Sequence, residues 1–221
     1  MTEPGWLAPL VAAARASRVE ELSRQLPPYD GARESAVLIA LRDETDGPAV
    51  LLIERAATMR RHAGQVGFPG GAVDPGDADP AATALREAHE EVGLDPSSVE
   101  IMATLPQLFV PPTRFVVTPV LGWWIRPHPV GVVDADEVAS VAVVPLAELA
   151  EPANRFRVQH PSGSLGPAFE AGGLFIWGFT ASVLDAVLRL GGWERTWDTQ
   201  RRRPLPQALG GSTAALGTVP P

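Results

Sequence analysis

The stretch Asp79-Pro-Ala-Ala-Thr-Ala-Leu-Arg-Glu-Ala-His-Glu-Glu-Val-Gly93 decides the fold of this 221-residue chain. The aspartate is a good helix N-cap, the proline suits the first helical position, and the final glycine is a typical C-terminal stop. At about 100° per residue, Glu87, Glu90 and Glu91 share one face, and alanine, leucine and valine side chains gather on a neighbouring face. The sequence therefore predicts a helix over 80–92 with one carboxylate face and one buried face.

Three like charges at this spacing are unfavourable in an isolated helix, above all near its negative C-terminal end. A bound divalent cation would reverse the sign of that effect. Glu87 and Glu91 lie one turn apart and can share a metal, while Glu90 can hold a second metal or orient water. Oxygen ligands in a chain without cysteine favour Mg²⁺ or Mn²⁺ over zinc. The helix alone leaves open the alternative of a solvated acidic face.

Charge is divided between two neighbouring segments. Residues 55–73 hold Arg55, Arg60, Arg61 and His62 and no acid, whereas residues 74–95 hold seven acids and a single cation. A metal-bound polyphosphate needs such a pair, because arginines neutralise phosphates and carboxylates hold the ion. The alternative is two ordinary solvated surface segments.

The rest of the chain predicts strands with interspersed helices and no regular βαβ alternation, which is typical of an α+β domain. A helix or helix pair is expected over 6–26, and residues 55–71 are expected to form an ordered loop. Strands are expected at 35–41, 49–53, 99–105, 115–124, 137–144 and 174–177, with a second long helix over 179–190.

Composition excludes several classes of function. The 18 cations are all arginine, so there is no P-loop lysine and no Schiff-base lysine, and the absence of cysteine removes thiolate chemistry. A net charge of −8 argues against nucleic acid and anionic membranes as partners. No signal peptide or membrane-spanning run is visible, which predicts a cytoplasmic protein.

The segment Arg86-Glu-Ala-His-Glu-Glu-Val-Gly-Leu94 resembles the second half of the Nudix box, Arg-Glu-apolar-x-Glu-Glu-x-Gly-apolar. The first half departs from that pattern. Counted from Gly71, the glutamate position holds Asp77, and eight residues rather than seven separate it from the arginine. Asp77 or Asp79 replaces this first carboxylate, or neither does.

A second resemblance lies upstream. Leu51-Leu-Ile-Glu-Arg-Ala56, followed by Arg60, Gly64 and Phe68-Pro-Gly-Gly71, is similar to the motif of coenzyme A pyrophosphatases within the Nudix family. Isoleucine and alanine stand where that motif has threonine and serine. Residues 176–181 also resemble the segment that opens the C-terminal helix of this subfamily, so the likeness covers roughly residues 34–190.

The resemblance implies a Nudix fold, a mixed β-sheet sandwiched between helices (α/β/α), over residues 34–197. A helical extension over 1–33 and a loose or disordered tail over 198–221 complete the predicted organisation. It also implies metal-dependent hydrolysis of the pyrophosphate of coenzyme A or a derivative, giving adenosine 3',5'-bisphosphate and 4'-phosphopantetheine. The alternatives are a Nudix hydrolase of nucleoside triphosphates or other nucleoside diphosphate derivatives, or a non-catalytic nucleotide-binding regulator.

The predicted site combines an overlapping set of metal-binding and catalytic residues with a set of substrate-binding residues. Glu87, Glu90 and Glu91 hold Mg²⁺ or Mn²⁺ and, with Arg86, make the catalytic group; Arg86 is expected to orient a glutamate. The predicted substrate-binding residues are Arg55, Arg60, Gly64, Phe68, Gly70 and Gly71.

The remaining polar and aromatic candidates have simpler interpretations. His62 and His89 are expected at the surface or in loops, and Glu137 is a remote base or, more simply, an acidic start to a strand. Trp123-Trp124 are expected in the core or at a dimer interface, so a homodimer stays open. The run 201–203 is expected to solvate a tail.

Overall fold

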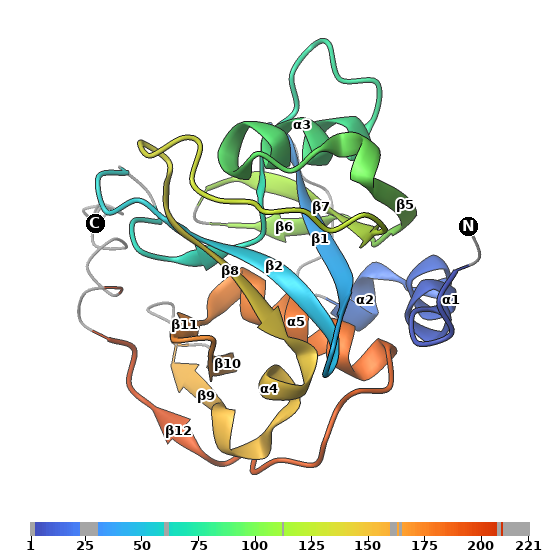
Figure 1. Cartoon of the computed structure of the whole chain (residues 1–221). Coiled ribbons are helices and arrows are strands. Elements are labelled where there is room, and N and C mark those ends of the chain that lie inside the picture. The colour runs from blue at the N-terminus through green and yellow to red at the C-terminus, as the bar shows by residue number, and fades with distance from the viewer. Residues whose placement is uncertain are drawn as a thin grey trace, which may run out of the picture.

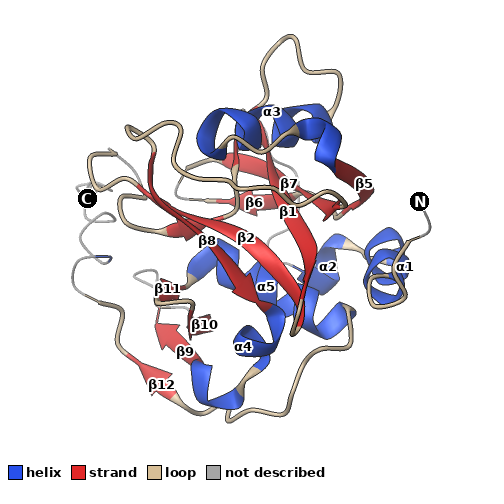
Figure 2. Cartoon of the chain, in the orientation of Figure 1, coloured by secondary structure: helices blue, strands red, loops and turns tan. Residues whose placement is uncertain are grey.

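The computed structural model describes residues 3–22, 31–59, 62–111, 113–159, 163, 165–206 and 209. In Figure 1 a large sheet crosses the middle of the molecule, with one helix above it and the other helices and a smaller sheet below it. The helices are α1 Ala8–Ala16, α2 Val19–Leu22, α3 Pro80–Val92, α4 Leu146–Ala150 and α5 Gly178–Leu190. The strands are β1 Arg33–Glu44, β2 Gly47–Arg55, β3 Val66–Gly67, β4 Gly70–Ala72, β5 Val99–Thr104, β6 Leu108–Val110, β7 Phe115–Trp124, β8 Val138–Pro145, β9 Arg155–Gln159, β10 Leu165–Ala171, β11 Leu174–Ile176 and β12 Arg202–Arg203. Figure 2 separates the two kinds of element by colour.

The large sheet is mixed. Its strand order is β3-β2-β1-β7-β5, and β4 pairs with β1, β6 with β7 and β8 with β2. The long strands β1 and β7 run parallel, with Arg33 opposite Phe115 and Leu41 opposite Trp123, while β1 and β2 form an antiparallel hairpin. The second sheet has the order β11-β10-β9-β12.

The two faces of β1 pack into two different cores. On one face Ala36 and Ala40 pack with Ala84 and Ala88 of α3, and these small side chains let the helix lie close to the sheet. The opposite face, which includes Ile39, packs in a larger core with α1, α4 and α5. This arrangement confirms the predicted α+β fold, a mixed sheet between helices.

Several short elements differ from the prediction. The predicted loop over 55–71 contains β3 and the start of β4, because Pro69 accepts a backbone bond from Leu38 and draws the glycines beside β1. The second sheet adds β9 and β10, and β6 and α4 were also not predicted. Such short strands depend on pairing with distant segments, which leaves little periodic signal in the sequence.

The predicted N-terminal extension and the start of the predicted C-terminal tail both contact the rest of the fold. In the predicted N-terminal extension, α1 packs on β5 and α5, and Arg15 Nη2 donates to the Met102 carbonyl at 2.9 Å. The beginning of the predicted loose tail forms β12, which pairs in parallel with β9, so this part is tied to the domain. Residues 210–221 lie outside the described residues. The boundaries at 33/34 and 197/198 stay predictions.

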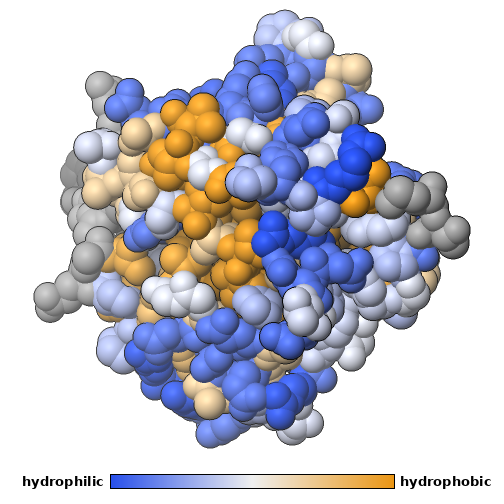
Figure 3. Space-filling view, viewed as in Figure 1, coloured by the Kyte–Doolittle hydropathy of each residue, from blue (hydrophilic) through white to orange (hydrophobic). Residues whose placement is uncertain are grey.

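The two adjacent tryptophans are not part of the exposed apolar surface. Trp123 and Trp124 are buried within the chain, which confirms the core interpretation. Figure 3 shows apolar surface gathered over β8 and the loop before it, where Val132 and Val133 are exposed. No helix in the described part of the chain is long and apolar enough to cross a membrane.

Candidate functional site

The site is built where α3 crosses the glycine strand β4. Gly70 has φ +156, and a Cβ there would lie 2.3 Å from the Ala36 carbonyl oxygen of β1. A Cβ on Gly71 would lie 2.4 Å from Glu87 Oε1. Only glycines therefore allow β4 to fit between the central strand and the carboxylate face of the helix.

Glu91 is the most enclosed acid of the helix. Its side chain is 3% exposed, and its Oε2 accepts a bond from the Gly70 N–H at 3.0 Å. Its Oε1 is buried and has no hydrogen-bond partner, with Arg55 Nη1 at 3.9 Å. Burial raises the pKa of the Glu91 carboxyl to about 8, against the opposing effects of the Gly70 bond and the Arg55 charge. Burial also raises the pKa of Glu87.

Arg86 holds the neighbouring carboxylates together. Its Nη1 donates to Glu87 Oε1 at 3.0 Å and to Glu90 Oε2 at 3.1 Å. Its Nε and Nη2 donate to the two oxygens of Asp77 at 3.0 and 2.9 Å, and Nη2 also donates to the Ala72 carbonyl. Arg86 thus fixes the helix acids relative to β4, which supports its predicted role in orienting glutamates.

The two aspartates before the helix have separate structural tasks. Asp79 caps α3 by accepting a bond from the Ala82 N–H at 2.8 Å. Asp77 also accepts bonds from the Thr83 hydroxyl and the Asp74 N–H. The bidentate bond from Arg86 holds the pKa of Asp77 well below its usual range. Asp77 is therefore the counter-ion of the arginine at the position where the box has its first glutamate.

Arg55 and Glu137 join the site from two other elements. Arg55, at the end of β2, lies between Glu91 and Glu137, with its Nη2 3.5 Å from Glu137 Oε2 and its Nε donating to Met59 Sδ. The Glu137 charge raises the pKa values of Glu87 and Glu91 further. The simpler interpretation, that Glu137 only starts a strand, is incomplete.

Backbone bonds explain why Glu137 lies there. In the β7–β8 loop, the N–H groups of Gly131 and Val133 donate to the carbonyls of Val92 and Glu91 at 3.1 and 3.0 Å. These bonds cap the end of α3 and tie the loop to the carboxylate helix. Residue spacing alone carries no sign of this connection.

Other predicted residues lie further from the acids. Phe68 is 3% exposed and packs in the large core, and its assignment to substrate binding stays a prediction. The Gly64 N–H donates to the Arg55 carbonyl, which makes it a backbone support of that arginine. Arg60 lies outside the described residues. His62 bonds Gln65, and His89 is exposed, as expected.

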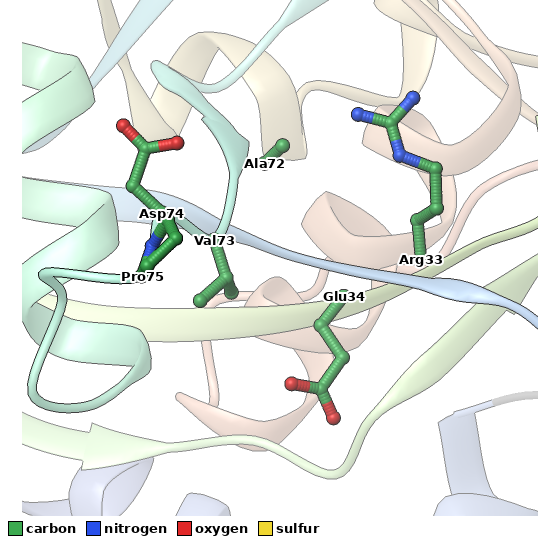
Figure 4. Close-up of a pocket in the computed structure, with 6 residues that line it drawn as sticks. All are labelled: Arg33, Glu34, Ala72, Val73, Asp74 and Pro75. Carbon is green, nitrogen blue, oxygen red and sulfur yellow. The ribbon is translucent and has the colours of Figure 1, made fainter.

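A surface hollow of about 370 Å³ adjoins the site without containing the helix acids. Figure 4 shows Asp74 and Arg33 on opposite sides of Ala72, the last residue of β4. Arg33 lies over the Phe115 ring, 4.8 Å from its centroid. The hollow therefore borders the C-terminal end of β4.

The described residues contain no preformed group of three acidic or histidine side chains that could hold a metal ion. Arg86 occupies oxygens of Glu87 and Glu90, and Glu91 is bonded to β4. The donor set nevertheless fits a hard divalent cation, because Glu91 presents a buried oxygen without a hydrogen-bond partner beside a glycine that leaves space for a second carboxylate.

Among solved structures, two Nudix hydrolases have a similar fold. The Nudix hydrolase RenU of Mycobacterium smegmatis matches with a TM-score of 0.53 at 17% identity, over 76% of this chain and 90% of that one. A Nudix hydrolase of Alicyclobacillus acidocaldarius matches with a TM-score of 0.51 at 22% identity, over 72% and 91%. At these identities the likeness concerns the fold.

Sequence comparison gives the family. The NUDIX domain model matches residues 32–162. An uncharacterised Nudix hydrolase, NudL of Cronobacter sakazakii, is 41% identical over 167 residues, which span 72% of this chain and 83% of the relative. The chain therefore belongs to the Nudix family. It is a hydrolase of pyrophosphate bonds in nucleoside diphosphate derivatives, a class that generally needs divalent metal ions such as Mg²⁺ or Mn²⁺.

Proposed function

We propose that this Nudix hydrolase cleaves the pyrophosphate of coenzyme A or one of its derivatives. The observation that carries the proposal is the upstream motif of residues 51–71, which resembles that of coenzyme A pyrophosphatases at most of its fixed positions. The products would be adenosine 3',5'-bisphosphate and 4'-phosphopantetheine, or its acyl form.

The geometry supports joint action of the motif and the box. Arg55 and Gly70 come from the upstream motif, and both contact Glu91 of the helix. Arg55 Nη1 lies 3.9 Å from Glu91 Oε1 and the Arg55 side chain is 22% exposed, so the guanidinium borders both the buried acid and the solvent. Arg55 therefore supplies positive charge where the phosphates of a bound substrate would meet the carboxylates.

We propose that Glu87, Glu90 and Glu91 hold Mg²⁺ or Mn²⁺. When bound, such an ion polarises a phosphoryl oxygen and lowers the pKa of bound water. Among the protein groups, Arg86 keeps Glu87 and Glu90 in place, and the Gly70 N–H fixes one oxygen of Glu91. Glu137 carries a half-exposed carboxylate that can accept a proton from attacking water.

Product analysis tests the proposal. Purified protein is incubated with coenzyme A, ADP-ribose or dGTP, each with Mg²⁺, with Mn²⁺ or with EDTA. We expect adenosine 3',5'-bisphosphate to appear fastest and only with metal. Turnover of only ADP-ribose or dGTP would overturn the coenzyme A assignment and keep the hydrolase. If none were hydrolysed, a nucleotide-binding regulator would be the better description.

Two variants separate the parts of the site. Glu91→Gln should abolish most metal-dependent turnover, because it replaces a charged ligand with a neutral amide. Arg60→Ala should raise the KM for coenzyme A with a smaller effect on kcat, since a phosphate contact acts in binding. Full turnover by Glu91→Gln would contradict the metal assignment, and unchanged constants for Arg60→Ala would remove that arginine from the site.

A further inference from the structure

The segment after α5 crosses the outside of the second sheet, and its last described residue, Leu209, lies against Gly64. This segment, residues 193–206 with Leu209, is called the C-terminal strap. In Figure 1 it runs from the foot of the molecule past β12 toward the connection between β2 and β3. Its contacts show that it does more than cover the sheet.

The strap is anchored at its start by a buried arginine. Arg155 of β9 is 1% exposed, and its Nη2 lies 3.2 Å from Glu194 and 2.5 Å from Asp185 of α5. The Trp197 ring stacks on the same guanidinium, 4.6 Å from centroid to Cζ. These contacts join the strap to both α5 and β9, so its direction is fixed before it reaches β12.

The middle of the strap extends the second sheet. Arg202 and Arg203 pair with Arg157 and Val158 of β9, and the Arg157 N–H donates to the Arg201 carbonyl at 2.9 Å. The Arg203 guanidinium lies 4.5 Å from the centroid of a phenylalanine ring in β9 and forms an ion pair with β10. This part of the run 201–203 is therefore structural.

The end of the strap covers a small separate core. Leu205 and Leu209 pack on a cluster formed by Phe156, Val158, Ala168 and Trp177. These side chains lie on the face of the second sheet that is turned away from the large core. The strap thus covers that face of the second sheet with Leu205 and Leu209.

Leu209 then meets the loop that supports Arg55. A Cβ on Gly64 would lie 3.5 Å from Leu209 Cδ2, so the leucine packs against the glycine backbone. The Gly64 N–H donates to the Arg55 carbonyl at 3.0 Å, and the Arg55 N–H donates to Gln65. Gly64 has φ +67 and needs no side chain to hold this turn. A continuous set of contacts therefore links the strap to the arginine beside Glu91.

We infer that the C-terminal strap is a positioning element of the substrate site, in which Leu209 holds the Gly64 turn and thereby the Arg55 guanidinium. The inference uses the hydrolytic site proposed above but does not depend on which nucleotide is the substrate. Since Glu91 is held separately by Gly70, loss of the strap contact should weaken substrate binding more than the chemical step.

Two truncated chains provide the direct test. A chain that ends at residue 209 keeps the contact with Gly64, and one that ends at residue 206 lacks it. Hydrogen exchange at the amides of Arg55 and Gly64 should be about tenfold faster in the 206 chain and unchanged in the 209 chain. Equal acceleration at β1 amides would show general loosening and would overturn the positioning role.

Point variants give the kinetic test. Leu209→Ser should raise KM about tenfold and change kcat by less than about twofold, and Leu209→Met should restore the KM. Leu165→Ser, at an exposed leucine of β10, is the matched control and should change neither constant. The substrate is coenzyme A, or ADP-ribose or dGTP if only those are hydrolysed.

The two proposals fail in different ways. Unchanged KM and unchanged exchange in Leu209→Ser would overturn the positioning role while turnover by the full chain persisted. Absence of turnover by the full chain would overturn the proposed function, and the exchange comparison would still decide the role of the strap.

Discussion

Metal-free protein should lose stability as the pH rises, and Glu91 should be the main cause. Burial raises the pKa of this carboxyl from 4.5 to about 8 in the folded protein, and in the unfolded chain it returns to its ordinary value. Between these pH values the folded state binds more protons than the unfolded state. The stabilising contribution of protonated Glu91 is therefore complete below the unfolded pKa and lost as the pH rises through the folded pKa.

The magnitude follows from the difference between the two pKa values. The full difference corresponds to about 5 kcal/mol, and the slope approaches about 1.4 kcal/mol per pH unit. From about pH 5.5 to about pH 8 the free energy of unfolding should thus fall by about 3 kcal/mol. The raised pKa values of Glu87 and Asp185 also make stability fall as the pH rises. The lowered pKa of Asp77 changes stability only at acidic pH, where stability is lost as the pH falls.

The assay is urea unfolding in EDTA across this pH range, for the natural chain and Glu91→Gln. The variant keeps an oxygen for the Gly70 N–H but cannot ionise. Over this pH range its free energy of unfolding should therefore fall by about 3 kcal/mol less than that of the natural chain. Glu90→Gln removes an exposed acid from the same helix face and should keep the slope of the natural chain. Parallel profiles for the natural chain and Glu91→Gln would refute the reasoning.

Magnesium supplies the second arm of this experiment. A cation binds the ionised carboxylate, so Mg²⁺ should stabilise the natural chain more at about pH 8 than at about pH 6. The same addition should have little effect on Glu91→Gln. An equal response of both proteins would place the ion elsewhere.

Three further predictions concern the surroundings of the helix acids. Gly71→Ala should lower kcat by about two orders of magnitude, because its Cβ would lie within 2.6 Å of a catalytic carboxylate, while Gly76→Ala, with open space around it, should match the natural enzyme in the same assay. Asp77→Asn should lower the midpoint of thermal unfolding, since Arg86 loses its charged bidentate partner; an unchanged midpoint would make this ion pair dispensable. Glu137→Gln should lower kcat with little change in KM, and a pure KM effect in steady-state kinetics would exclude a role as proton acceptor.

The helix and the long strands could be predicted because local signals agreed with the final packing. Helix 80–92 has an N-cap, a proline at the first position and a glycine stop, and the structure places its ends at Pro80 and Val92. Strand 115–124 is a nearly continuous apolar run that matches β7. The alternation Arg-Phe-Arg-Val-Gln over 155–159 was a usable signal for β9 and was missed.

The contacts that bring distant segments together at the site have no comparable signal in the sequence. Arg86 was expected to orient a glutamate, but its bond to Asp77 depends on how residues 73–79 turn back onto the helix. Glu137 lies beside Arg55 because its carbonyl accepts a bond from the Ala56 N–H, and backbone groups of its loop also bind the end of α3. Phe68 belongs to a glycine-rich motif, and its burial depends on the strand pairing around it. Contacts of this kind are set by long-range geometry.

The electrostatic difficulty posed by the helix sequence has a physical answer in the structure. Like charges at this spacing disfavour the helix, and two devices offset that cost without metal. Arg86 neutralises the partly exposed acids Glu87 and Glu90, while burial favours the protonated form of Glu91. A divalent cation would then have to displace a proton from Glu91 and compete with an arginine for the other two acids. Metal binding should therefore release protons, and the affinity for Mg²⁺ should depend steeply on pH. Calorimetry that measures both the affinity for Mg²⁺ and the number of protons released would show whether the ion binds at Glu91.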